Sequence, residues 1–221
     1  MSHTYADALV IGQKAHARKP ADFYPTPADV TEALLQFLKL PPEQYVWEPA
    51  CGDGAMSRVI ERHGHQVLST DLREDSGYGE GGIDFLAFDI DPPSGIPFSA
   101  VYNDWIITNP PFNLAEAFIR KALSITPNVA MLLKSQYWHA ARRLALFEEH
   151  RPSWVLPLTW RPAFLEAERG RSPLMDVIWV VWQGKANFTD FQPLRRPVFH
   201  AVPKMRQLPV RPSTSLTALL A

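Results

Sequence analysis

Hydrophobic positions along the chain follow two alternating spacings, one typical of amphipathic helices and one typical of short buried strands. Apolar residues at helical spacing predict helices over residues 29–40, 55–63, 114–124 and 136–150. Short apolar runs predict strands over residues 45–47, 66–70, 129–133, 154–158 and 176–182, and within residues 100–108. This alternation predicts an α/β fold with a mostly parallel sheet, and the apolar strands indicate that helices cover both of its faces.

The two ends of the chain differ from this middle region in composition. Residues 1–21 are polar without clear periodicity, which predicts a flexible N-terminal arm. Residues 185–221 are basic and contain prolines at 193, 197, 203, 209 and 212. Prolines at this density are incompatible with a long helix or a central strand. We therefore expect one globular domain over residues 22–184, followed by an extended tail that is either wrapped on the domain or loose.

Length and cysteine content restrict the class of protein. The 221 residues suit one medium-sized domain with its own hydrophobic core. Cys51 is the only cysteine, so no disulfide forms within the chain, which is typical of a reducing, intracellular compartment. The sequence has neither a signal-peptide pattern nor an apolar run of the roughly 18 residues that a membrane span needs. The expected location is cytoplasmic, without membrane contact.

The net charge of −1 conceals an asymmetry between the two parts of the chain. Residues 1–133 carry a net charge of −8, whereas residues 134–221 carry +7. Such asymmetry indicates contact with nucleic acid, although an uneven scatter of solvated charges explains it equally well. Candidate phosphate contacts, each of which taken alone also fits a solvated surface residue, are Arg142, Arg143, Arg161, Arg169, Arg171, Arg195, Arg196, Lys204 and Arg206.

A glycine-rich turn follows the strand predicted at residues 45–47. It reads Glu48-Pro-Ala-Cys-Gly-Asp-Gly54, and its glycines allow a close approach of the backbone to a ligand. Ligands of open α/β sheets bind beyond the carboxyl ends of the strands. Glu48 and Asp53 disfavour a phosphate and favour a ligand with a positively charged amino group. Asp71, which ends the next strand 17 residues after Gly54, is placed to bind ribose hydroxyls. Taken alone, these features also fit an ordinary glycine turn and a solvated carboxylate.

The most specific pattern is Asn109-Pro110-Pro111-Phe112, directly after the strand predicted within residues 100–108. The two prolines fix an extended backbone and remove two amide donors. The Asn109 side chain and the Pro110 carbonyl can then accept hydrogen bonds from one NH₂ group, while Phe112 offers a face on which a base can stack. A proline-rich turn with an asparagine cap is the alternative, and the neighbouring motifs make it the weaker interpretation.

Together with Asp22-Phe-Tyr-Pro-Thr-Pro27, these motifs resemble the adenine-N6 branch of the amino-methyltransferases, the class that includes DNA adenine methyltransferases. The order of cofactor flank, glycine turn and catalytic loop is similar to the gamma arrangement of that family, and the likeness extends over residues 22–182. Small phage and prophage enzymes are the group that the chain resembles most. The resemblance implies a Rossmann-like class I methyltransferase fold with a seven-stranded sheet, the cofactor S-adenosylmethionine and a DNA substrate.

The resemblance also implies roles for the matching residues. Asp71 would bind the cofactor ribose, Asp84 would bind the cofactor adenine amine, and Phe85 would pack on the adenine ring. The other expected cofactor contacts are Tyr24, Pro25, Thr26, Glu48, Pro49, Ala50, Cys51, Gly52, Asp53, Gly54, Leu72 and Asn109.

The catalytic residues implied by the resemblance are Asn109, Pro110, Pro111 and Phe112. Asn109 would act as an orienting acceptor for the adenine amine rather than as a base. For binding of the substrate base we expect Phe112 with Trp160, Arg161 and Phe164, of which Trp160 and Phe164 equally fit the core.

Alternatives to DNA adenine methylation remain open. Methyltransferases of ribosomal RNA that act on adenine N6 or guanine N2 can share Asn-Pro-Pro-Phe, and Tyr24-Pro-Thr26 also occurs in an adenine branch of these enzymes. Enzymes that methylate a protein glutamine usually carry tyrosine where Phe112 stands. A non-catalytic nucleic-acid-binding subunit would be expected to lose Asn109, Glu48 or Asp71, which are all present. No spacing of ligand residues indicates a metal site, and a second copy of the chain remains a candidate partner. The short insertions after Phe112 and Leu158 predict weak or very short sequence specificity.

Overall fold

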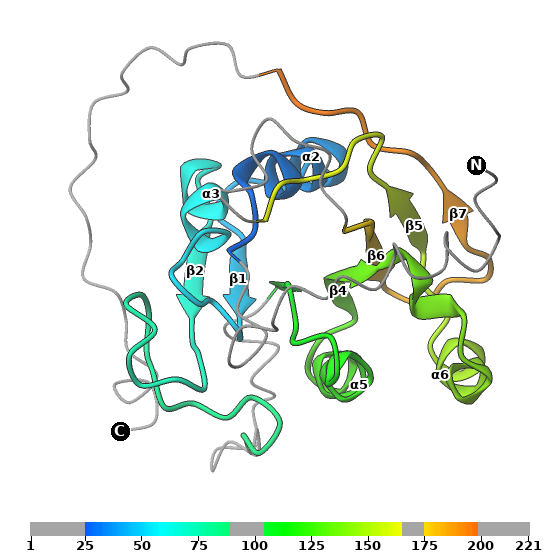
Figure 1. Ribbon diagram of the computed structural model, residues 1–221, viewed down its shortest axis with the longest axis horizontal. Coiled ribbons are helices and arrows are strands. Elements are labelled where there is room, and N and C mark those ends of the chain that lie inside the picture. The colour runs from blue at the N-terminus through cyan, green and yellow to red at the C-terminus, as the bar shows by residue number, and fades with distance from the viewer. Residues whose placement is uncertain (1–24, 89–103, 165–174, 199–221) are drawn as a thin grey trace, which may run out of the picture.

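A computed structural model describes residues 25–88, 104–164 and 175–198 of the chain (Figure 1). These residues form a seven-stranded sheet with the strand order β2-β1-β3-β4-β6-β5-β7. The strands are β1 (Tyr45–Glu48), β2 (Gln66–Ser69), β3 (Trp105–Thr108), β4 (Asn128–Lys134), β5 (Trp154–Pro157), β6 (Val177–Gln183) and β7 (Asp190–Phe191). The expected N-terminal arm at 1–21 and the tail beyond residue 198 lie outside the described residues.

The sheet is mostly parallel, as the sequence predicts. β1 pairs in parallel with β2 and with β3, β3 pairs in parallel with β4, and β5 pairs in parallel with β7. Only β6 is reversed, because it is antiparallel to β4 on one side and to β5 on the other. All residues from Val177 to Trp182 are buried, as expected for a strand with neighbours on both sides and helices over both faces.

Helices cover both faces of the sheet, which confirms the predicted fold class. α2 (Ala28–Leu38) and α3 (Ser57–Arg62) lie on one face, and α5 (Ala115–Ile125) and α6 (Leu144–Glu149) lie on the other (Figure 1). The buried side chains accordingly form two hydrophobic clusters, one beneath each pair of helices. Burial of these helix faces against the sheet supplies the main driving force for the fold.

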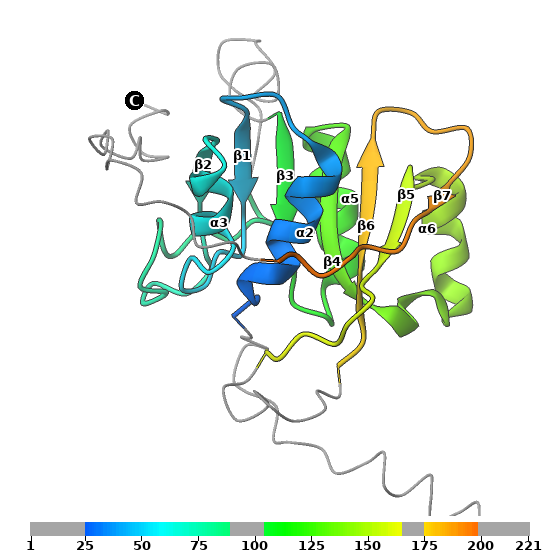
Figure 2. The ribbon, with the colours of Figure 1, turned by 90° about the horizontal axis from the view of Figure 1, so that it is seen from above.

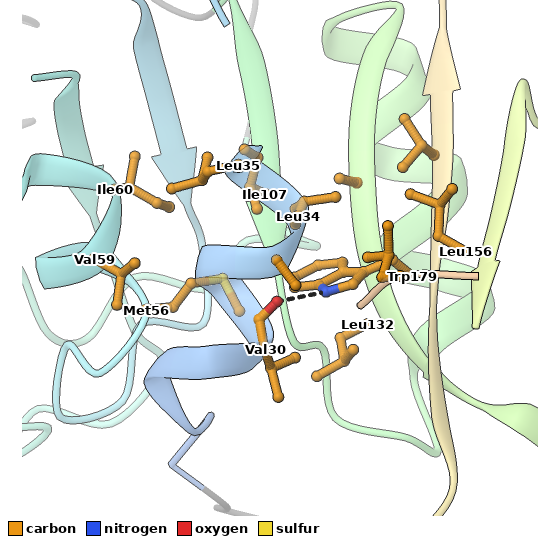
Figure 3. Close-up of a cluster of buried hydrophobic side chains, with 14 of the residues drawn as sticks. Val30, Leu34, Leu35, Met56, Val59, Ile60, Ile107, Leu132, Leu156 and Trp179 are labelled. Carbon is orange, nitrogen blue, oxygen red and sulfur yellow. Dashed lines mark hydrogen bonds between the residues drawn. The ribbon is translucent and has the colours of Figure 1, made fainter. Parts of the chain in front are cut away.

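The cluster beneath α2 and α3 is centred on Trp179 of β6. Its indole Nε1 donates a hydrogen bond of 3.0 Å to the backbone carbonyl of Val30 in α2 (Figure 3). Leu34, Leu132 and Leu156 belong to the same cluster and are fully buried. The indole therefore joins the helix to the sheet both by packing and by a hydrogen bond within the core.

The cluster on the opposite face is rich in aromatic side chains. Trp47 of β1 meets Phe85 in an edge-to-face arrangement with ring centroids 5.1 Å apart, and the Phe85 ring lies 5.0 Å from that of Phe118 in α5. The Trp47 indole also donates a hydrogen bond of 2.9 Å to the Thr70 hydroxyl. This cluster fixes the segment around Phe85 against β1 and α5.

The helix predicted over residues 136–150 is wrong in its first part. The structure has two short 3₁₀ turns there, Ser135–Trp138 and Ala141–Arg143, before α6 begins at Leu144. Ala140 between the turns is extended, with φ −146° and ψ 114°. The break turns Tyr137 into the core, and this tertiary packing outweighs the helical periodicity of the segment.

The segment after β6 returns along the far edge of the sheet. β7 pairs with β5 through Trp154–Asp190 and Val155–Phe191, and the chain then runs back toward α2 (Figure 1 and Figure 2). Arg196 forms an ion pair with Asp29 of α2, with an Nε–Oδ2 distance of 2.8 Å. The described part of the proline-rich segment is therefore wrapped on the domain. None of the helices in the described residues has the length and apolar character of a membrane span.

Candidate active site

A cleft lies at the carboxyl ends of the first three strands. From β1 the chain runs through α3 to β2 on one side, whereas β3 pairs with β1 on the other side. Connections that diverge in this way leave a crevice in which ligands of α/β sheets bind. The cleft encloses about 880 Å³, including open solvent at its mouth. That space is large enough for a ligand of cofactor size.

Most of the cofactor residues expected from sequence line this one cleft. They are Pro25, Thr26, Glu48, Pro49, Ala50, Cys51, Gly52, Asp53, Asp71, Leu72, Asp84, Phe85 and Asn109, and Pro111 joins them. Gly54, Pro110 and Phe112 are not among the lining residues, and Tyr24 lies outside the described residues. Ala55, Met56, Arg73, Ile83, Leu86, Leu114 and Phe118 also line the cleft, although no motif had indicated them.

The glycine turn has a left-handed backbone at two positions. Gly52 has φ +58° and Gly54 has φ +77°, a region that favours glycine. A Cβ at Gly54 would also lie 2.3 Å from the Tyr78 ring. Gly54 therefore allows Tyr78 to pack against the turn, whereas Gly52 lines the cleft itself.

Glu48 ends β1 and is almost fully buried, with 2% of its surface exposed. The Ser57 hydroxyl donates a hydrogen bond to its carboxylate, and Ser57 in turn lies 2.7 Å from the Ser69 hydroxyl. Burial, together with the nearby carboxylates of Asp53 and Asp71, raises the pKa of Glu48 to about 8 against the lowering effect of the Ser57 hydrogen bonds. The site thus holds a carboxyl group that a cationic ligand would convert to its charged form.

Asp71 joins the end of β2 to the glycine turn. One carboxylate oxygen accepts a hydrogen bond of 2.7 Å from the backbone N–H of Gly52. The other oxygen accepts hydrogen bonds from the backbone N–H and the Nε of Arg73, at 2.9 and 3.1 Å. The side chain of Asp71 is therefore held in place before any ligand arrives.

Asp84 and Phe85 form another part of the wall of the cleft. The Asp84 side chain is exposed and accepts a hydrogen bond of 2.9 Å from the backbone N–H of Leu86. Phe85 is 2% exposed and packs between Trp47 and Phe118. A carboxylate at the rim and an apolar ring beside it suit a ligand that carries both an amine and a flat heterocycle.

Asn109 lies directly beyond the end of β3, and its amide has one partner. Its Nδ2 donates a hydrogen bond of 3.1 Å to the hydroxyl of Thr26, which precedes α2. Its Oδ1 is buried and has no hydrogen-bond partner in the described part of the chain. A buried acceptor without a partner costs free energy in the folded state, which indicates that a ligand donates a hydrogen bond to this oxygen when it binds.

The pairing of Thr26 with Asn109 was not foreseen from sequence. The motif around Thr26 had indicated a cofactor contact, and the two residues are 83 positions apart. Only the packing of α2 against the sheet brings the hydroxyl to the amide. A threonine and an asparagine in two separate site motifs were the sole sequence signal.

Phe112 lies outside the cleft and lines a second cavity. The ammonium Nζ of Lys134, at the end of β4, lies 4.3 Å from the centroid of the Phe112 ring. The two cavities therefore lie on either side of the loop that carries Asn109 and Phe112.

The other residues expected to bind the substrate base line neither cavity. Phe164 is 5% exposed and belongs to the core cluster beneath α2, and Trp160 packs against that cluster. Arg161 pairs with Asp176 at 2.7 Å. Their role in base binding stays a prediction.

Comparisons with known proteins support the fold. No family model and no curated protein sequence matches the chain. The methyltransferase subunit of a type I restriction-modification system from Streptococcus thermophilus is 14% identical with a TM-score of 0.57, over 86% of this chain and 50% of that one. The modification subunit of a proposed type I restriction enzyme from Vibrio vulnificus is 14% identical with a TM-score of 0.57, over 83% of this chain and 48% of that one.

A proposed RNA methyltransferase from Pyrococcus horikoshii is 16% identical with a TM-score of 0.53, over 82% of this chain and 100% of that one. At these identities the likeness shows the fold, which is the Rossmann-like α/β fold of class I methyltransferases. The chain spans about half the length of the two restriction-modification subunits.

Proposed function

We propose that this protein transfers a methyl group from S-adenosylmethionine to the exocyclic N6 amine of adenine in DNA. The observation that carries the proposal is the buried, unpartnered Oδ1 of Asn109 at the edge of the cleft. Thr26 binds the other end of the same amide, so the carbonyl oxygen is held ready for a donor. An exocyclic NH₂ group is a ligand that such an acceptor suits.

The chemistry of the cleft fits the cofactor. Glu48 and Asp53 suit the amino group of its methionine part, and Asp71 suits the ribose hydroxyls. Asp84 suits the adenine amine, and the ring of Phe85 suits the adenine face. The bound cofactor supplies a methyl group that is already activated by a sulfonium.

Asn109 would orient the amine that receives the methyl group. The lone pair of adenine N6 is delocalised into the ring, so the nitrogen is a poor nucleophile. Hydrogen bonds from N6–H to Asn109 Oδ1 and to the Pro110 carbonyl favour a tetrahedral nitrogen and direct its lone pair toward the cleft. The protein then contributes positioning and electrostatic stabilisation, without a covalent intermediate.

A paired base cannot reach this position inside a duplex. It must be flipped out, at a cost of a few kcal/mol, or be single-stranded already. The Phe112 ring would stack on the extruded base. The ammonium of Lys134 lies over the Phe112 ring. The base would stack on the part of the ring that Lys134 does not cover.

The decisive test measures transfer of labelled methyl groups to unmethylated DNA and to total RNA in parallel, followed by nucleoside mass spectrometry. We expect N6-methyladenine in DNA, with a rate at least about 10²-fold lower in Asn109→Ala. Asn113→Ala, an exposed asparagine of the same loop, is the matched control and should retain the native rate. Label in RNA alone, or in neither nucleic acid, would contradict the proposal.

A further inference from the structure

The second cavity lies at the carboxyl end of β4, beside the candidate site. It measures about 480 Å³ including open solvent at its mouth, and its lining includes Phe112, Lys134, Gln136, Tyr137 and Arg143. Phe112 follows directly on the loop that carries Asn109, so whatever occupies this cavity lies next to the position proposed for the target base. The cofactor motifs do not account for this cavity.

Two cations line the cavity without a carboxylate among its lining residues. Lys134 Nζ lies over the Phe112 ring, and the Arg143 guanidinium lies 3.8 Å from the centroid of the Tyr137 ring. Neither cation forms an ion pair with an acidic side chain of the described residues. The aromatic faces hold the two charges in place, and Arg143 Nη1 also donates a hydrogen bond to the Tyr137 carbonyl. The remaining donors of the two cations are available to an anion.

Two donors in the cavity wall also have no partner. The Tyr137 hydroxyl and the Arg143 Nε are buried, and neither forms a hydrogen bond within the described part of the chain. Tyr137 is 5% exposed, and burial raises the pKa of its hydroxyl, so that the group stays protonated and can donate. Donors that are buried without an acceptor are rare in folded proteins and indicate a missing ligand.

We propose that this cavity binds a backbone phosphate of the nucleic acid, next to the target base. The inference rests on the proposed function, and it deepens that function by favouring nucleic acid over a protein amide as substrate. Two cations, one of which carries an unpartnered Nε, and the unpartnered Tyr137 hydroxyl match the oxygens of a phosphodiester. Such contacts fix the position of the strand without reading its sequence.

The first test compares Arg143→Gln with Arg142→Gln. Both variants remove one positive charge, but Arg142 is exposed and does not line the cavity. We expect Arg143→Gln to weaken binding of a labelled oligonucleotide roughly tenfold and to reduce the salt dependence by about one phosphate contact. Arg142→Gln should have a clearly smaller effect. Equal losses in the two variants would overturn the proposal.

A second test assigns the contact to one phosphate. Single methylphosphonate linkages, which lack the phosphate charge, are placed in turn on either side of the target adenine. One of them should weaken binding by the native protein and add nothing to the loss in Arg143→Gln, because the same contact is already absent. Additive losses at every position would contradict the proposal.

Cofactor binding and thermal stability separate this inference from the proposed function. Arg143→Gln should keep the native cofactor affinity, measured by calorimetry. It loses the contacts of Arg143 with the Tyr137 ring and carbonyl, so thermal unfolding checks that the variant is folded at the assay temperature. If the native protein transfers methyl groups to DNA while Arg143→Gln binds DNA like Arg142→Gln, only the phosphate site fails. If it transfers none while nucleic-acid binding still depends on Arg143, only the proposed function fails.

Discussion

At the scale of single residues, three polar side chains of the candidate site are each held by a partner from another segment. Thr26 binds the Asn109 amide, Ser57 binds the Glu48 carboxylate, and the Asp71 carboxylate binds the glycine turn. Such contacts fix side-chain positions before ligands bind, which lowers the reorganisation that the reaction would need. The positioning partners therefore provide tests that leave the reacting groups themselves intact.

Thr26 acts as a positioning residue for Asn109 in this arrangement. Thr26→Val removes the hydroxyl that binds Asn109 Nδ2 and keeps the side-chain shape, so the amide loses its orientation. We expect kcat to fall roughly five- to twentyfold, the equivalent of about one hydrogen bond, which exceeds any loss of cofactor affinity from the same substitution. Steady-state kinetics checks the split between kcat and KM. Thr26→Ser keeps the hydroxyl and should keep the native rate. A native kcat in Thr26→Val would show that the hydrogen bond between Thr26 and Asn109 does not contribute to the reaction.

Glu48 should make the stability of the ligand-free protein depend on pH. Its pKa is about 8 in the folded protein and near 4.5 in the unfolded chain, so the folded state holds the proton more tightly. This contribution to stability is fully present below pH 4.5 and is lost as the pH rises through 8. Glu48→Gln has no carboxyl group to ionise, so it should not lose this stability at high pH. It should therefore be more stable than the native protein at pH 9. Urea unfolding at pH 5, 7 and 9 measures the free energy of unfolding of both proteins.

A matched control for this experiment is Glu148→Gln, which changes an exposed glutamate of α6. It should keep the pH profile of the native protein. A Glu48→Gln profile that runs parallel to the native one at all three pH values would mean that Glu48 is ionised in the folded state.

The individual site residues could be predicted because they belong to contiguous motifs. The runs at residues 48–54 and 109–112 place their side chains at strand ends by local sequence alone. Contacts across the fold left no such signal, since Thr26 and Asn109 meet only after α2 packs on the sheet. Lys134 and Tyr137 were missed for the same reason, because the second cavity forms between β4, α5 and the turns that follow.

At the scale of elements, the strands were easier to predict than the helices. Central strands such as β4 and β6 are apolar runs buried on both faces, so composition alone marks them. The 136–150 segment has helical periodicity, but the burial of Tyr137 breaks it at Ala140. The two-residue strand β7 could not be foreseen, because exposed edge residues carry no apolar pattern.

The attachment of α2 to the sheet depends on Trp179. Trp179→Phe leaves the Val30 carbonyl without its indole donor and opens space in the core. We expect a loss of roughly 1–3 kcal/mol in the free energy of unfolding, and about 2–4 °C in Tm for each kcal/mol. Thermal unfolding followed by circular dichroism measures the shift.

Trp154→Phe makes the same chemical change on the neighbouring strand β5. Trp154 is only partly buried and contacts Phe37 of α2 through its ring, which phenylalanine can partly replace. The loss in the free energy of unfolding should be clearly smaller in Trp154→Phe than in Trp179→Phe. Equal shifts in Tm for the two variants would mean that the bond to Val30 contributes nothing.

At the scale of the whole molecule, little of the described part of the chain is available for reading a base sequence. β3 and β4 are joined there by α5 and short loops. Under the proposed function, the basic part of the chain, from residue 134 onward, would offer phosphate contacts that are independent of sequence.

The short length of described chain that is available for base recognition predicts weak or short sequence specificity of methylation. Genomic DNA that lacks methylation, treated with the protein and cofactor and then sequenced by a method that detects N6-methyladenine, should show modified adenines in a short or degenerate context. A long, strictly defined site would contradict this expectation and would imply recognition by surfaces outside the described residues.

The ion pair between Arg196 and Asp29 joins positions 167 residues apart, and Val198 and Pro25 lie within four residues of its two members. Within the described residues these two points therefore lie near each other, beside the wall of the candidate cleft. A circular permutant, with these two points joined by a short linker and new ends opened in an exposed turn, should keep the same cleft and the same Asn109. The order in which the cofactor and catalytic motifs occur along the chain is then a matter of where the loop is cut, and the chemistry of the site does not depend on it.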